Sequence, residues 1–183
     1  MARTWLSIRV ELVSGRGVEP WPRPGRIFAA ARSHTFEQLA AAIDTAFARW
    51  DLAHMHTFTL ADSTEITTLD LWDGDEPEGS LDSATTKLSR LTPGEQFAYL
   101  FDFGDDWAHL CTVDTTKIDP LDHIGVVPPV PVPYFGWGDL PDQYGRRWDE
   151  DDGGSARPKR PAQPLSALPP ILPWWGGPRR RGE

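Results

Sequence analysis

The sequence predicts an α+β fold: a single mixed or antiparallel sheet with one main amphipathic helix on one face. Three patterns predict it, namely strict alternation of apolar and polar residues at 5–13, a capped helical pattern at 35–50, and an aromatic hairpin at 97–114. Two strands, a helix and then further strands are compatible with a β-grasp-like arrangement. The chain of 183 residues predicts one domain, which we place at 3–150, followed by a tail at 151–183.

The strands are predicted from alternation of apolar and polar residues. Residues 5–13 place Leu6, Ile8, Val10 and Leu12 on one face, as a half-buried strand requires. A loop with three prolines and two glycines separates this strand from a second at 26–32. Two more strands are expected at 55–61 and 65–72, and a short helix at 83–91.

The main helix is predicted to begin after Thr35 and to run to about Trp50. Thr35 and Gln38 have the spacing of a capping box, and apolar residues then recur every three or four positions. Because only one stripe of this helix is apolar, it must pack against another element, and the neighbouring strands make the sheet the expected partner.

Residues 97–114 are predicted to form a hairpin whose first strand carries four aromatic side chains on one face. A three-residue loop would place Trp107, His109, Cys111 and Val113 on that aromatic face. A loop of two or four residues would place Ala108, Leu110 and Thr112 there instead. We favour the first register because it brings the larger side chains into the core.

Composition changes at residue 120, because 13 of the 18 prolines and nine of the 16 glycines lie from Pro120 onward. We expect residues 120–150 to form an ordered, aromatic, Pro/Gly-rich strap without regular secondary structure. Residues 151–183 are expected to be a disordered, Pro-rich, basic tail. This tail contains Trp174 and Trp175, followed by three arginines, as a short adhesive motif.

Charge excludes several function classes. Residues 33–152 hold 24 acidic and six basic residues, so the folded domain should repel phosphate backbones and anionic membranes. Only the basic tail remains as a candidate for nucleic-acid contact. No membrane span or signal peptide is predicted, and the single cysteine, Cys111, is expected in the core, so we expect a cytoplasmic protein with a protein partner.

The hairpin segment at 97–109 has the sequence Phe-Ala-Tyr-Leu-Phe-Asp-Phe-Gly-Asp-Asp-Trp-Ala-His. This segment resembles the central signature of the plasmid pRiA4b Orf-three-like family. Residues 21–58, with a helix that ends in Trp-Asp before His54 and Phe58, are similar to the first half of that family. The resemblance implies a link to insertion sequences, in which such proteins are labelled resolvase-like passengers. After Asp114 the chain departs from the family pattern, because its strap lacks cysteine.

Two interpretations of the polar residues in this hairpin remain open. Gly104 tolerates positive φ and its aspartate neighbours cap their own turns, so turn chemistry is favoured. Alternatively, carboxylates with an imidazole could bind Mg, Mn or Zn. The candidate metal ligands are His54, His56, Asp102, Asp105 and His109.

We therefore favour a non-enzymatic binding or accessory module without a cofactor, associated with mobile elements as the resemblance implies. Its candidate binding residues come from the hairpin turn and the strap: Asp102, Asp105, Asp106, Trp107, His109, Trp137 and Tyr144. The alternative is a metal-assisted hydrolase or nuclease that uses the Asp/His cluster between Asp102 and His109. The two hypotheses differ in whether the carboxylates and imidazoles converge in space.

Overall fold

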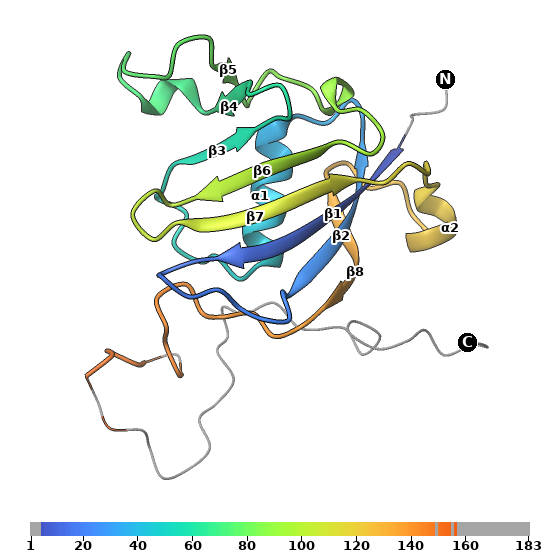
Figure 1. Cartoon of the computed structure of the whole chain (residues 1–183). Coiled ribbons are helices and arrows are strands. Elements are labelled where there is room, and N and C mark those ends of the chain that lie inside the picture. The colour runs from blue at the N-terminus through green and yellow to red at the C-terminus, as the bar shows by residue number, and fades with distance from the viewer. Residues whose placement is uncertain (1–4, 149, 155, 157–183) are drawn as a thin grey trace, which may run out of the picture.

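The computed structural model describes residues 5–148, 150–154 and 156. It contains one mixed sheet in the order β5-β4-β3-β6-β7-β1-β2-β8, in which only β4 and β5 pair in parallel among the described strands. One long helix, α1, crosses behind this sheet (Figure 1). The α+β class predicted from the sequence is confirmed.

The strands have the following bounds: β1 Trp5–Ser14, β2 Gly25–Ala31, β3 His56–Thr59, β4 Glu65–Thr67, β5 Leu81–Asp82, β6 Gln96–Phe101, β7 Trp107–Val113 and β8 Val132–Trp137. The helices are α1 Phe36–Ala46 and α2 Pro120–Ile124, with single 3-10 turns at Leu69–Leu71 and Leu88–Arg90. The predicted strand at 65–72 therefore ends early in a 3-10 turn, and most of the predicted helix at 83–91 is not helical. None of the helices among the described residues is long and apolar enough to cross a membrane.

Helix α1 begins as the sequence predicts. The Thr35 hydroxyl accepts the Gln38 backbone N–H at 3.1 Å, and the Gln38 side chain accepts the Thr35 N–H at 2.9 Å. The helix ends at Ala46, four residues earlier than predicted, because Ala48 takes a left-handed conformation with φ of 63°. This reversal turns the chain away before Trp50.

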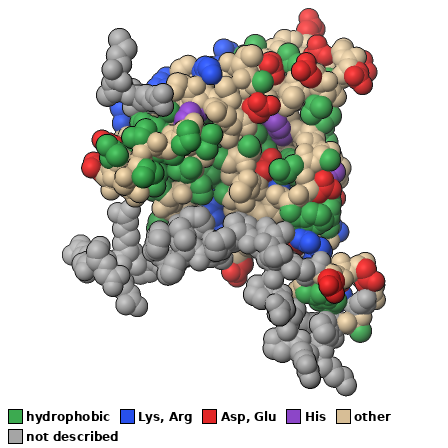
Figure 2. All heavy atoms as spheres, turned by 180° about the vertical axis from the view of Figure 1, so that it is seen from behind, with side chains coloured by type: hydrophobic (Ala, Val, Ile, Leu, Met, Phe, Trp, Pro, Cys, Tyr) green, Lys and Arg blue, Asp and Glu red, His purple; other side chains and the backbone are tan. Residues whose placement is uncertain are grey.

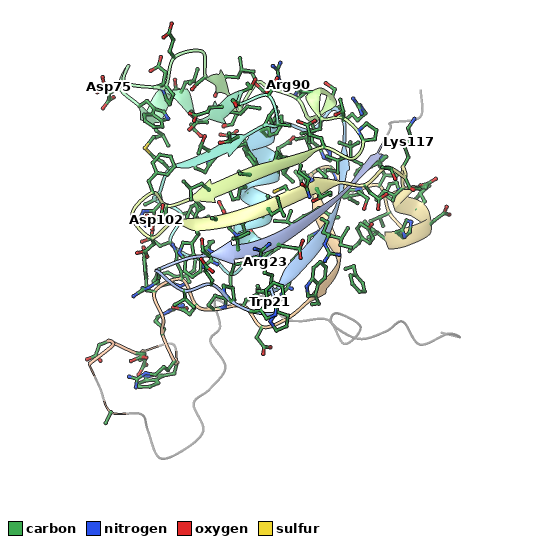
Figure 3. All side chains as sticks on the ribbon, in the orientation of Figure 1. Trp21, Arg23, Asp75, Arg90, Asp102 and Lys117 are labelled. Carbon is green, nitrogen blue, oxygen red and sulfur yellow. The ribbon has the colours of Figure 1, made fainter. Side chains whose placement is uncertain are left out.

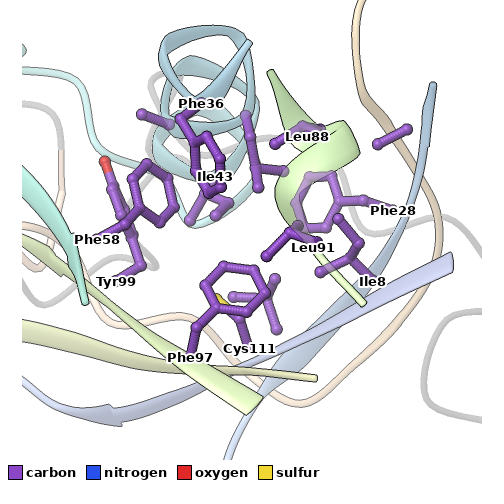
Figure 4. Packing of buried hydrophobic residues seen from close by; sticks show 14 of the residues in the cluster. Ile8, Phe28, Phe36, Ile43, Phe58, Leu88, Leu91, Phe97, Tyr99 and Cys111 are labelled. Carbon is purple, nitrogen blue, oxygen red and sulfur yellow. The ribbon is translucent and has the colours of Figure 1, made fainter. Parts of the chain in front are cut away.

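The core lies between the sheet and α1. Phe58, Tyr99 and Cys111 point from the sheet toward Phe36 and Ile43 of the helix, and all five are fully buried (Figure 4). A smaller cluster on the other face joins Trp5, Ala29 and Ala31 to Ile118, Ile124 and Tyr134. Burial also raises the pKa of the Cys111 thiol, so this cysteine is an inert core residue rather than a nucleophile.

The strap contains regular structure, contrary to the prediction from its proline content. Helix α2 has Asp119 as its N-cap and Pro120 in its first turn. The first turn is the part of a helix that tolerates proline. Strand β8 pairs with β2 at the edge of the sheet. Proline is acceptable in an edge strand because its missing N–H can face outward. The tail beyond residue 156 lies outside the described residues.

Candidate functional site

The turn between β6 and β7 spans residues 102–106, and its conformation depends on Asp102. This residue has φ of 59°, and its Oδ1 accepts the backbone N–H groups of Gly104 at 3.0 Å and Asp105 at 3.3 Å. Asp106 has φ of 52°, whereas Gly104 does not have a positive φ. The left-handed positions expected of the glycine are therefore occupied by aspartates, which tolerate this conformation because their side chains bond locally.

The register of the hairpin places the predicted residues in the core. Phe101 pairs with Trp107 and Tyr99 with His109, so Trp107, His109, Cys111 and Val113 share the aromatic face and are buried. The loop has five residues rather than the predicted three, because the chain leaves β6 at Asp102. Phe103 consequently lies outside the strand and is 37% exposed.

Four side chains meet on the inner side of this turn, and we call Asp51, His54, Asp102 and Tyr144 the polar clasp. His54 Nδ1 lies 3.5 Å from Asp102 Oδ2, and His54 Nε2 lies 2.8 Å from the Tyr144 hydroxyl. That hydroxyl donates to Asp51 Oδ2 at 2.8 Å. Burial and this bond to Asp51 raise the pKa of Tyr144 to about 12. Tyr144 therefore keeps its proton at neutral pH and acts as a hydrogen-bonding group.

Neighbouring strap residues attach to the loop that follows α1. Gln143 is fully buried, and its Oε1 accepts the backbone N–H groups of Trp50 at 2.8 Å and Asp51 at 2.9 Å. Asp142 accepts two hydrogen bonds from the Arg146 guanidinium, at 2.8 and 3.0 Å. Burial would raise the pKa of Asp142, but the hydrogen bonds from Arg146 and the backbone outweigh it and lower the pKa. These contacts hold the strap against the domain.

A second polar group lies deeper, beneath the turn. The Arg49 guanidinium stacks over the Trp107 ring at 3.5 Å, and both residues are almost fully buried. Asp44 accepts the Tyr99 hydroxyl at 2.7 Å. Burial raises the pKa of Asp44 to about 7 and lowers that of Arg49 to about 10, while their mutual attraction opposes both shifts. Trp107 thus supports a buried cation.

The candidate metal ligands do not converge. Only His54 reaches Asp102, whereas His109 contacts the Tyr99 carbonyl and His56 packs on the Phe58 and Tyr99 rings. Burial lowers the pKa of His56 to about 4 and that of His109 to about 3, so both rings are neutral at pH 7. Within the described residues no three His, Cys, Asp or Glu side chains are placed to hold a metal ion.

Comparison with known protein families confirms the family resemblance of the hairpin sequence. A family model described as Plasmid pRiA4b ORF-3-like protein matches residues 10–126, which include the whole β6–β7 hairpin. The chain belongs to this family. The family match ends before β8, so the strap contacts of Gln143 and Tyr144 lie outside it. No curated protein matches the chain.

A solved structure supports the fold of this family member. The crystal structure of MM3350, a protein of unknown function from Methanosarcina mazei Go1, matches with a TM-score of 0.53 and 19% sequence identity. The match covers 72% of this chain and 69% of that chain. At this identity the likeness establishes the fold alone.

The outer side of the β6–β7 turn carries a surface that sequence reasoning missed. The Phe103 ring lies 5.8 Å from that of Trp72, next to Leu71, which is 55% exposed. The chain segment that contains Trp72 carries five exposed carboxylates, from Asp70, Asp73, Asp75, Glu76 and Glu78. We call these eight residues the acidic aromatic surface. Its signal in the sequence was the acidic run at 70–78, which contains no Lys or Arg.

Trp137 belongs to neither side of the turn. Strands β1 and β2 separate β7 from β8, and the Trp137 indole donates to the Arg23 carbonyl at 2.8 Å. Asp105 and Asp106 also stay outside the polar clasp: the Asp105 carbonyl accepts the Arg16 N–H, and Asp106 is exposed. Of the seven predicted binding residues, only Asp102 and Tyr144 enter the polar clasp.

Proposed function

We propose that this family member is a non-enzymatic protein-binding module that uses the acidic aromatic surface. The observation that carries the proposal is the ring contact between half-buried Trp72 and exposed Phe103, beside exposed Leu71. Figure 2 shows carboxylates gathered with apolar side chains at its upper right, the corner that corresponds to β4 and β5 in Figure 1. Exposed apolar groups bordered by charge are typical of protein-interaction sites.

The charge of this surface selects the class of partner. Residues 70–78 carry five carboxylates and no cation, so they repel nucleic-acid phosphates and attract a basic peptide. The rings of Trp72 and Phe103, inclined at 43° to one another, offer area for an aromatic or apolar side chain of the same peptide. The plasmid origin in the family name supports, within this proposal, a partner connected with mobile elements.

A synthetic peptide of alternating Arg and Trp tests the proposal. We expect it to bind the full-length protein, and we expect Phe103→Ala to weaken binding about tenfold because the exposed ring of the pair is lost. Titration calorimetry at low and high salt measures both the affinity and its electrostatic part. The matched control is Leu121→Ala, which removes a 55% exposed residue of α2.

The outcomes of this titration are distinct. The proposal requires that Leu121→Ala binds as the wild type does and that a Glu/Trp peptide does not bind. Equal binding of the acidic peptide, or unchanged affinity of Phe103→Ala, would overturn the proposal.

A metal-assisted hydrolase or nuclease remains the second candidate, and one contact favours it. His54 and Asp102 lie 3.5 Å apart and supply two ligands, while His54 is partly accessible. We expect protein purified without chelators to contain no stoichiometric metal, because a transition-metal site needs at least three protein ligands. Elemental analysis of wild type and His54→Gln measures this. One equivalent of metal that is lost in His54→Gln would establish the metal site instead.

A further inference from the structure

We infer that residues 174–181 of this same chain, Trp-Trp-Gly-Gly-Pro-Arg-Arg-Arg, occupy the acidic aromatic surface as an intramolecular ligand. The inference rests on the proposed function, because it names the occupant of the proposed binding surface. It assigns a regulatory role to a segment that lies outside the described residues. A basic partner would have to displace this segment before it could bind.

The chemistry of the segment matches the surface in both of its parts. Arg179, Arg180 and Arg181 supply three adjacent cations, opposite five exposed carboxylates at 70–78. Trp174 and Trp175 supply two rings for the exposed Phe103 ring and the half-buried Trp72 ring beside it. Charges of opposite sign steer the encounter, and aromatic contacts add affinity.

The strap contacts the turn that carries Phe103, one residue of this surface. Tyr144 binds His54, and His54 contacts Asp102, the residue directly before Phe103. The strap therefore meets the domain at the turn that carries the acidic aromatic surface. Figure 3 shows Asp102 and Asp75 on the same side of the molecule, whereas Figure 1 shows the last described strap residues below the sheet, at the other end from β4 and β5.

The connecting chain has 17 residues. Residues 157–173 separate the described chain from Trp174, and about 3.1 Å per residue gives a Pro-rich segment of this length a span of roughly 50 Å. A short flexible linker gives a tethered ligand an effective concentration in the millimolar range. The tail therefore competes well with a free peptide of similar intrinsic affinity.

Nuclear magnetic resonance of the full-length protein tests this occupancy. The probes are the Trp72 indole N–H and the Phe103 amide, compared between wild type and the charge reversal Arg179→Glu, Arg180→Glu, Arg181→Glu. The matched control reverses the same number of charges closer to the domain, at Arg157, Lys159 and Arg160. We expect both probes to shift in the first variant, to keep their wild-type positions in the control, and to move toward the variant positions when salt is added to the wild type.

Peptide competition gives a second readout. We expect the Arg/Trp peptide to bind the Arg179–181 reversal about tenfold more tightly than the wild type, because the intramolecular competitor is lost. Wild-type probe positions that change on dilution would show that the tail of a second copy is the occupant, which overturns the inference.

Failure of the inference is distinguishable from failure of the proposed function. If the charge reversal leaves both probes unchanged but the added peptide shifts them, the surface binds basic peptides and the tail is not its occupant. If neither the reversal nor the peptide shifts the probes, both the inference and the proposed function are wrong.

Discussion

Trp107→Ala is expected to lower the free energy of unfolding by about 5 kcal/mol. Removing a buried Trp side chain costs roughly 3–5 kcal/mol, and the buried Arg49 guanidinium would also lose the ring on which it stacks at 3.5 Å. Small domains are stable by about 5–15 kcal/mol, so much of this variant should be unfolded at 25 °C. Urea denaturation followed by circular dichroism measures the loss.

Two variants serve as controls for Trp107→Ala. Trp107→Phe keeps an aromatic face beneath Arg49 and should cost about 1–3 kcal/mol. Trp21→Ala removes a tryptophan that is 83% exposed and should change stability by about 0.5 kcal/mol or less. Equal stability of Trp107→Ala and Trp107→Phe would contradict the role assigned to the ring under Arg49.

His56→Phe is expected to raise the free energy of unfolding relative to wild type at pH 4. We expect the difference between variant and wild type to be roughly 3 kcal/mol more favourable at pH 4 than at pH 7. Burial lowers the pKa of His56 from 6.5 to about 4, so the unfolded chain takes up a proton that the folded protein resists. Stability from the neutral ring is therefore lost as pH falls from about 6.5 to about 4. Phenylalanine fits the site because His56 Nε2 has no hydrogen-bond partner and the ring contacts Phe58 and Tyr99.

The measurement is urea unfolding of wild type and His56→Phe at pH 7 and pH 4. His109, with a pKa of about 3, destabilises both proteins equally as pH falls. Asp44 has the opposite effect on stability in both proteins, because burial raises its pKa to about 7. Between about pH 4 and pH 7 the folded state therefore binds a proton at Asp44 that the unfolded chain does not, and stability from this group rises as pH falls. These contributions cancel in the difference between the proteins. A difference that does not depend on pH would show that the fold does not lower the pKa of His56.

Local patterns in the sequence predict local structure well. The reciprocal bonds of Thr35 and Gln38 follow from one capping motif, and the alternation at 5–13 predicts β1. The register that brings the larger side chains of the hairpin into the core correctly predicts the buried face of β7. The early end of α1 could not be predicted, because Ala48 has no intrinsic preference for the left-handed conformation that stops the helix.

Contacts between distant segments account for most of what the sequence does not predict. Strand β8 is defined by pairing with β2, about a hundred positions earlier, and high proline content argues against it locally. The sequence makes Tyr144 a candidate because it is aromatic. Its hydrogen bonds with Asp51 and His54 depend on where the strap packs against the domain, which the sequence does not show. Similarly, the pairing of Trp72 with Phe103 depends on how the 3-10 turn meets the hairpin.

The central claim is that the polar clasp at the β6–β7 turn holds the strap. Hydrogen exchange of Tyr144→Phe tests this claim most directly, because the variant keeps the ring beside Trp50 and removes the hydroxyl shared by His54 and Asp51. The control is Tyr134→Phe, which removes a hydroxyl bound to Ser7 elsewhere in the strap.

We expect faster exchange in Tyr144→Phe at the amides that the strap fastens, those of Trp50, Asp51 and Arg146. The turn amides of Gly104 and Asp105, which Asp102 caps on its own, should exchange at the wild-type rate. In Tyr134→Phe all five amides should keep wild-type rates. Wild-type exchange at Trp50, Asp51 and Arg146 in Tyr144→Phe would contradict the claim.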